Sequence, residues 1–257
     1  MIFQKMKKTE REFLLIRVFT VIILITLPQI LFAGPPFLTD DPDSVQFKHW
    51  EYYISSQNTF SHSTHTSTGT LPHFEVNYGL VPNIQVHLIM PLNYSYSASR
   101  YDAYGYANTE LGVKYRFVKE SANCPEIGTF PILEIPTINN STLSNGKTQL
   151  FIPVWVQKSW DKLTSYGGGG YWINPGTGNK NWVFVGWQAQ YEFSKTLSLG
   201  SEVYYHTADA KDSASSSGFN LGGFLNFSEK FHFIFSVGHS ITNQNYSTVY
   251  AGFLLTI

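Results

Sequence analysis

Carboxylate, ammonium and imidazole side chains recur at alternate positions of extended segments along most of the chain. Adjacent residues of a strand point to opposite faces, so residues of one parity share a face. That face carries more acids than bases. In a pore it would favour cations or polar neutral solutes, because rings of like charge select ions by sign. The candidates for a lumen lining are Glu51, Glu75, His87, Glu110, Lys114, Arg116, Glu134, Trp155, Glu192, Glu202, Tyr204 and His206.

The same side chains are equally compatible with a filled lumen. Acids, Lys114 and Arg116 would then satisfy one another by hydrogen bonds, as buried polar groups normally do. Twelve strands enclose a space between the filled eight-stranded barrels and the open sixteen-stranded ones. The sequence leaves both interpretations open, an open pore and a plugged barrel.

Two further groups could be interpreted as ligand sites. Asp40, Asp41 and Asp43 offer oxygen ligands that a hard cation would use, but Asp and Pro in this spacing favour a turn at the barrel entrance. The glycine run 167–170 is no phosphate loop, because no Lys-Ser/Thr follows it. Glycine inside a strand indicates a bend or a close approach instead. We expect no metal and no cofactor.

The sequence offers only weak candidates for a catalytic set of residues. His62 and His65 lie in a short polar tract, which favours a solvated loop over a metal or catalytic site. His239 and Ser240 are the nearest pair for an outer-membrane lipid enzyme, but adjacent strand residues point apart and cannot form a nucleophile–base hydrogen bond. We therefore predict that the protein is not an enzyme. The single cysteine, Cys124, is expected to be a free thiol in a turn.

Composition limits the class of protein. Of 257 residues, 43% are hydrophobic and 14% are charged, and the net charge is −1. This balance excludes a nucleic-acid binder with a basic face. The mean hydropathy of −0.12 excludes a bundle of transmembrane helices. One cysteine excludes an internal disulfide.

The N-terminus predicts export. A basic segment from Lys5 to Arg17 precedes an uncharged stretch from Val18 to Phe32, and small residues allow cleavage after Ala33. The stretch is shorter than the roughly 20 residues of a spanning helix, which argues against a retained anchor. We predict a cleaved signal peptide over 1–33, a periplasmic segment over 34–46 and a β-barrel over 47–257.

Period-two alternation dominates the mature chain and predicts a transmembrane antiparallel barrel of about twelve strands. Short connections alternate with long polar ones, as periplasmic turns alternate with extracellular loops in such barrels. A secreted β-sandwich is the rival, but its strands would be shorter and its outer face more charged. The expected strands are 47–60, 70–80, 84–97, 106–118, 128–138, 147–159, 163–173, 181–193, 196–207, 218–227, 230–239 and 247–257.

The start of the mature chain contains a stretch that resembles the same region of a known protein family. The stretch Pro36-Phe37-Leu38-Thr39-Asp40-Asp41-Pro42 is followed by Trp50-Glu51. About 18 residues here resemble a family of bacterial outer-membrane proteins labelled MetA-pathway of phenol degradation, or transporter. The resemblance implies a barrel in the Gram-negative outer membrane, in some members linked to uptake of aromatic or other hydrophobic compounds.

The last residues point to the same compartment. Phe253, Leu255 and Ile257 alternate up to the C-terminus and resemble the signal read by the barrel-assembly machinery, except that this signal usually ends in Phe. We expect three partners: outer-membrane lipid, the assembly machinery and a small solute, with no nucleic acid. The expected function is a channel or uptake protein for small solutes. A closed structural or adhesive barrel is the alternative, and a lipid-modifying enzyme comes third.

Overall fold

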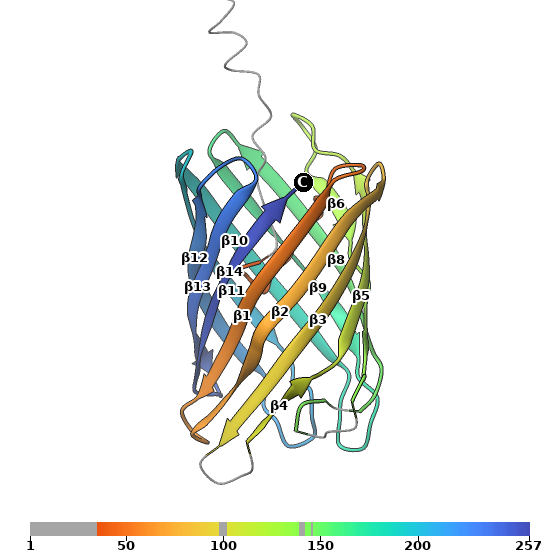
Figure 1. Ribbon diagram of the computed structural model, residues 1–257, viewed down its shortest axis with the longest axis vertical. Coiled ribbons are helices and arrows are strands. Elements are labelled where there is room, and N and C mark those ends of the chain that lie inside the picture. Colours follow the sequence, from red (N-terminus) through yellow and green to blue (C-terminus); the bar gives the residue numbers. More distant parts are fainter. Residues whose placement is uncertain (1–34, 98–101, 139–141, 145) are drawn as a thin grey trace, which may run out of the picture. The chain divides into compact units, whose positions relative to one another are not determined.

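A computed structural model describes residues 35–97, 102–138, 142–144 and 146–257, so the expected signal segment 1–33 lies outside the described residues. These residues form long strands around a closed sheet (Figure 1). None of them forms a helix long and apolar enough to cross a membrane. The strands are β1 (Trp50–Ser61), β2 (Thr66–Val81), β3 (Ile84–Ser97), β4 (Ala103–Tyr106), β5 (Thr109–Val118), β6 (Glu126–Thr129), β7 (Ile132–Ile135), β8 (Gln149–Trp160), β9 (Leu163–Ile173), β10 (Trp182–Ser194), β11 (Leu197–His206), β12 (Ser216–Asn226), β13 (Phe231–Thr242) and β14 (Tyr246–Thr256).

The sheet closes because its first and last strands pair. β1 and β14 run antiparallel, with Glu51 opposite Thr256 and Ser61 opposite Tyr246. β4 and β5 both pair with β3 and form one crossing of the wall. β6 and β7 both lie between β5 and β8 and form another. Twelve antiparallel crossings result, and the predicted fold class is confirmed.

Alternation along each strand separates two environments. In β8, Phe151 and Trp155 point inward and are buried, whereas Ile152 and Val154 point outward and are each 50% exposed. The same outward exposure recurs for aliphatic residues of every long strand, for example Val113 and Val203. A continuous apolar belt of this kind would be unstable in water and fits contact with lipid. Closing the sheet pairs the backbone groups that a bilayer could not hydrate.

The two ends of the barrel differ. At one end, here called the turn end, short connections join β2 to β3, β8 to β9, β10 to β11 and β12 to β13. Asn83 and Asp161 have φ values of 69° and 53° there, which suits tight turns. The C-terminus lies at this end (Figure 1). The opposite end, the loop end, carries the longer connections, including 136–148 and 207–215.

The first connection at the loop end is shorter than expected. A polar loop over 61–70 is predicted from its Ser, Thr and His content, but β2 already begins at Thr66, opposite Ser61. Threonine suits strands as well as loops, so the hairpin continues outward beyond the apolar part of the wall. Composition alone could not separate a polar strand from a polar loop.

The glycine run of β9 allows aromatic rings to lie against the wall. A side chain at Gly170 would stand 2.5 Å from Phe151 Cε2, and one at Gly168 would stand 3.0 Å from Trp155 Cε3. Gly168 also has a φ of 153°, which residues with side chains rarely adopt. The predicted close approach is present, and it makes room for two large inward-facing rings from the neighbouring strand.

Candidate functional site in the barrel lumen

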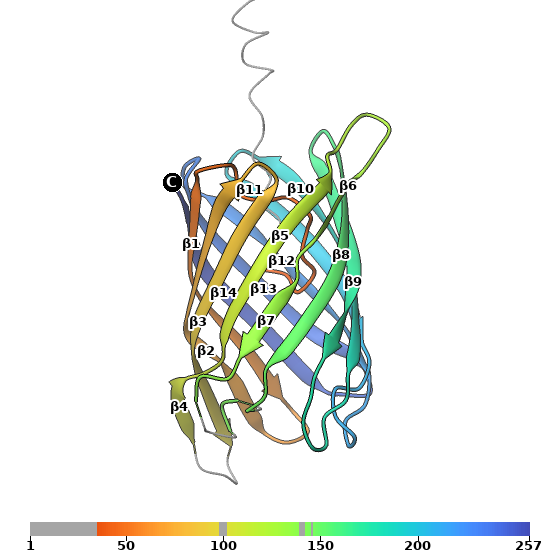
Figure 2. The same ribbon diagram turned by 90° about the vertical axis from the view of Figure 1, so that its right-hand side faces the viewer.

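The chain's own N-terminal residues fill part of the lumen. Residues 35–46, here called the N-terminal loop, enter from the turn end and lie inside the barrel (Figure 2). The Pro36 carbonyl accepts a 2.7 Å hydrogen bond from Ser236 Oγ on β13. Thr39 is fully buried. The structure differs here from the expectation of a periplasmic segment, because this loop finds polar partners on the inward face of distant strands.

Glu202 on β11 holds the tip of the loop. Its carboxylate accepts hydrogen bonds from the backbone N–H groups of Leu38, at 3.1 Å, and of Thr39. A third hydrogen bond, of 2.6 Å, comes from Asn220 Nδ2 on β12. Glu202 is only 1% exposed. This buried acid is therefore satisfied by N–H donors and needs no cation.

Two cations on β5 hold the acidic part of the loop. Lys114 Nζ lies 2.9 Å from Asp40 Oδ1 and 3.4 Å from Asp41 Oδ2. Arg116 pairs with Asp43. Asp41 Oδ1 also accepts a 2.6 Å hydrogen bond from the backbone N–H of Asp43. The three acids thus make the expected turn, but they make it inside the barrel and bind side chains of the wall.

Burial changes the acidity of the loop. Removal from water raises the pKa of Asp41 well above its ordinary value, and the positive charge of Lys114 only partly offsets this. Burial likewise raises the pKa of Asp43, against the opposing effect of Arg116. Docking of the loop therefore favours proton uptake by these two carboxyls. Within the described part of the chain, no three His, Cys, Asp or Glu residues are grouped as a metal would need.

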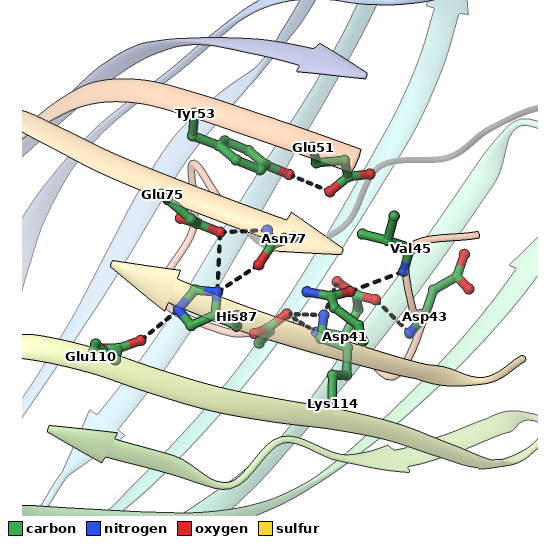
Figure 3. A network of polar contacts seen from close by, with 12 residues as sticks. Asp41, Asp43, Val45, Glu51, Tyr53, Glu75, Asn77, His87, Glu110 and Lys114 are labelled. Atoms are coloured by element: carbon green, nitrogen blue, oxygen red, sulfur yellow. Dashed lines mark hydrogen bonds and ion pairs between the residues drawn. The ribbon is translucent and has the colours of Figure 1, made fainter. Parts of the chain in front are cut away.

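A second polar network lines the wall beside the loop, on β1 to β5 (Figure 3). His87 Nδ1 lies 2.6 Å from Asn77 Oδ1, and His87 Nε2 lies 2.9 Å from Glu110 Oε1. Asn77 Nδ2 donates to Glu75 at 2.8 Å. At the turn end of the same wall, Tyr53 Oη donates to Glu51 at 3.1 Å. The three predicted acids Glu51, Glu75 and Glu110 are therefore held by neutral or imidazole partners, and the predicted His87 lies between Asn77 and Glu110.

His73 on β2 is the exception in this network. It is buried, and neither ring nitrogen has a hydrogen-bond partner among the described residues. Glu110 and His87 are the titratable groups that interact with it electrostatically. A buried imidazole that lacks a partner normally indicates a place for water or a solute.

The opposite side of the lumen is aromatic. Phe151 stacks on Trp172 with 4.8 Å between ring centroids, and Trp172 stacks on Trp182 at 5.4 Å. Trp172 and Trp182 pack against a buried aromatic cluster that consists of Phe130, Phe151, Trp155, Phe184 and Tyr204. Trp172 and Trp182 lie near the loop end and are only partly buried.

The other predicted residues are distributed along the same inward face. Glu134 on β7 accepts a 2.8 Å hydrogen bond from Gln149 Nε2 on β8. Tyr204 Oη and Tyr246 Oη lie 3.2 Å apart near the loop end. His206 packs edge-on against Trp182. Glu192 lies near the turn end of β10 and does not join the two networks above.

Sequence reasoning did not single out several inward-facing amides. Gln85 Oε1 accepts a 2.9 Å hydrogen bond from the Val45 N–H of the N-terminal loop. Gln157 and Gln188 are buried in the lumen as well. The alternation of inward and outward residues along their strands is a signal that would have placed all three in the lumen. They carry no charge, and only charged or aromatic residues and histidines were predicted as lining residues.

The candidate catalytic pair is not assembled. His239 Nδ1 lies 3.1 Å from Ser247 Oγ, whereas Ser240 Oγ donates to the Gln244 carbonyl. Ser240 is buried on the inward face and His239 is on the outward one, as strand parity predicts. His62 Nε2 lies 2.9 Å from the same Ser247. Cys124 is a free thiol between β5 and β6.

No family model and no curated protein matches this sequence. Solved structures do match its fold. The COG4313 outer membrane channel from Pseudomonas putida F1 is similar with a TM-score of 0.70 and 13% identity, over 88% of this chain and 100% of that one. The chain has the fold of outer-membrane β-barrels.

Two other solved outer-membrane barrels are similar to this fold. The NanC porin has a TM-score of 0.56 at 7% identity, over 79% of this chain and 98% of that one. The translocator domain of the autotransporter NalP from Neisseria meningitidis has a TM-score of 0.55 at 9% identity, over 82% and 90% of the two chains. An outer-membrane barrel of this kind places its short turns in the periplasm and its long loops outside the cell.

Proposed function

We propose that this outer-membrane barrel is an uptake channel for small solutes whose lumen is closed by its own N-terminal loop. One observation carries the proposal. The loop is held in the lumen by ion pairs and hydrogen bonds from β3, β5, β11 and β13, whereas the strands of the wall hold each other by continuous ladders. Polar contacts of this kind exchange with water far more readily than a closed sheet opens.

The location of the two ends supports a direction of passage. The loop end faces the cell exterior in such barrels, and the partly buried rings of Trp172 and Trp182 lie there. The N-terminal loop enters from the turn end, on the periplasmic side. A solute would therefore reach the rings of Trp172 and Trp182 before it reached the N-terminal loop. Release of the loop would open the way to the periplasm.

The resemblance to the family labelled MetA-pathway of phenol degradation supports aromatic or other hydrophobic compounds as solutes. The stretch that carries it, Pro36 to Pro42, is the part of the chain that enters the lumen. Trp172 and Trp182, which are only partly buried beside the aromatic cluster, offer apolar surface for such compounds. The proposed partners are outer-membrane lipid, the barrel-assembly machinery and this small solute.

A closed structural or adhesive barrel is the second candidate, and the filled lumen favours it. Conductance across a planar bilayer separates the two. A channel is expected to show openings in the full-length mature protein, and proteoliposomes that contain it should admit small solutes. A barrel that stays silent at all voltages and excludes all small solutes would contradict the channel. We propose no lipid-modifying activity, and unchanged phospholipid turnover in His239→Ala would agree with that.

A further inference from the structure

A cavity with an uncharged polar lining, here called the polar cavity, lies in the loop-end half of the barrel. Its volume is about 270 Å³. Among the described residues that line it, none carries a charge. Asn93 has the same parity on β3 as the buried Ile89, so this lining faces the lumen. The lining side chains that end in a hydroxyl or a carboxamide come from β1, β2 and β3 and include Gln57, Thr59, Thr68, Thr70 and Asn93.

Strand register brings these side chains together on one face. Gln57, Thr70 and Asn93 stand opposite one another in three consecutive strands. Thr59 and Thr68 form the next row toward the loop end. Side chains directly opposite each other lie about 5 Å apart, and two residues along a strand span about 7 Å. The five side chains therefore cover a patch of about 10 Å by 7 Å, which one small molecule can contact as a whole.

Most of the polar groups in this patch have no partner within the protein. Among the described residues, no hydrogen bond engages the carboxamide of Gln57 or the hydroxyls of Thr59 and Thr68. Asn93 Oδ1 also lacks a hydrogen-bond partner there. The Thr70 hydroxyl accepts a 3.3 Å hydrogen bond from the Gln57 backbone N–H, and its own O–H can still donate. The polar cavity therefore offers closely spaced donors and acceptors to a ligand.

The connection 136–148 bounds the polar cavity on another side. Asn93 Nδ2 donates a 3.3 Å hydrogen bond to the Leu143 carbonyl, and Leu143 is buried. Thr142 and Leu143 both line the cavity. The cavity thus lies between the wall and a loop-end connection. Its volume is below the roughly 300–1,000 Å³ of pockets for drug-sized ligands, so it suits a small solute.

We propose that the polar cavity binds a neutral solute with several hydroxyl groups, such as a monosaccharide. Each hydroxyl of such a solute can donate and accept, as the threonine and carboxamide side chains of the lining can. A bare aromatic ring would leave most of these groups unpaired, and a charged solute would find no opposite charge in the lining. The inference rests on the proposed function only in that the solute reaches the cavity from the loop end. It assigns that solute a different class from the aromatic compounds that the family resemblance supports.

Saturation-transfer NMR on the full-length mature protein in detergent tests the cavity, with empty micelles as the blank. Glucose is the probe, and cationic glucosamine, anionic gluconate and phenol are the comparators. We expect saturable binding of glucose at least about fivefold tighter than of any comparator, the scale of one polar group left unpaired. Added salt should not weaken it, because no charge takes part. Equal or tighter binding of a comparator would overturn the proposal, and this comparison needs no variant.

Matched variants locate the binding. Thr59→Val and Thr68→Val each remove one hydroxyl and keep the shape of the side chain, and each should weaken glucose binding about fivefold. Thr256→Val makes the same change on the inward face at the turn end, opposite Glu51, and should bind glucose as the parent does. Unchanged binding in both site variants, or an equal loss in Thr256→Val, would overturn the assignment.

A comparison with solute entry into proteoliposomes separates this inference from the channel itself. Saturable glucose binding by a barrel that never conducts and admits no solute would support the polar cavity and contradict the channel. Solute entry without saturable glucose binding would support the channel and contradict the polar cavity as a binding site.

Discussion

The ammonium of Lys114 on β5 lies 2.9 Å from the carboxylate of Asp40 in the N-terminal loop, across 74 residues of sequence. The lysine side chain is 6% exposed. Its charge therefore depends on the loop for compensation, and the loop depends on the lysine. We therefore expect docking of the loop to depend on this ion pair as well as on the contacts with β3, β11 and β13.

Loss of Lys114 is expected to open the barrel. In Lys114→Met, Asp41 would remain buried without its cation, and removing one partner of a buried pair costs about 3–5 kcal/mol. Docking of the loop should weaken, and the open time of single channels in planar bilayers should rise at least tenfold, about 1.4 kcal/mol at minimum. Lys158→Met is the control, because Lys158 pairs with Glu120 and not with the loop. An equal effect in both variants would contradict the assigned role of Lys114.

Conductance should depend on pH through the loop. The pKa values of Asp41 and Asp43 are raised by burial, whereas the released loop would have carboxyls near the ordinary value of 3.8. The docked loop therefore binds more protons, and docking is favoured below the raised pKa values and weakens as the pH rises through them. We expect current to increase with pH above about 4 in bilayer recordings. Asp41→Asn should flatten this dependence, and a current that falls as the pH rises would refute it.

Charge selectivity should follow Glu110 on β5 and Glu134 on β7. In the opened Lys114→Met background, Glu110→Gln combined with Glu134→Gln is expected to reduce the preference for cations, because two carboxylates are removed from the lining. The reversal potential in a salt gradient measures this preference. Glu229→Gln, in the turn before β13, is the control. An unchanged reversal potential in the double variant would count against an acidic lining.

An arginine on the outward face should prevent assembly. Val113 points outward from β5 and is 46% exposed. Arginine near the middle of a bilayer costs about 2–4 kcal/mol in such barrels. Val113→Arg should reduce the folded fraction seen by heat-dependent electrophoretic mobility, whereas Val113→Leu should fold normally. Normal assembly of the arginine variant would show that this face does not contact lipid.

The glycine run should tolerate no side chain on its inward positions. Gly168→Ala would force a methyl group against Trp155 and the Val154 carbonyl at a φ of 153°. Overpacking of this kind costs about 1–3 kcal/mol, measured as a loss of unfolding free energy in urea. Gly105→Ala is the matched control, since its nearest neighbour, Leu143 Cδ1, would stand 3.6 Å away. Equal stability of both variants would show that close packing at Gly168 is unimportant.

Much of this fold could be predicted because the alternation of apolar and polar residues is visible within each strand by itself. Lipid on one side and a lumen on the other impose an alternation that is visible in β8 or β5 residue by residue. Strand limits therefore agree with the expected ranges to within a few residues for most crossings. The exceptions, such as the early start of β2 at Thr66, fall where strands leave the apolar belt and composition stops discriminating.

The arrangement of the site could not be predicted in the same way. Which strand an acid of the N-terminal loop would meet depends on the shape of the closed barrel, because Asp40 and Lys114 are distant in sequence. The resemblance of Pro36 to Pro42 marked the stretch as distinctive without saying where it lies. Likewise, the row from Phe151 to Trp182 brings together three strands, and no spacing within one strand reveals such a row.

The contacts of Thr39 and Pro36 with β11 and β13 also set an order of events during biogenesis. These anchoring strands follow the loop by 163 and 200 residues, so the residues that are synthesised first acquire their native neighbours only after nearly the whole chain has been exported. The loop can therefore complete its native contacts only once β13 has joined the wall, so its docking belongs to the last stage of folding.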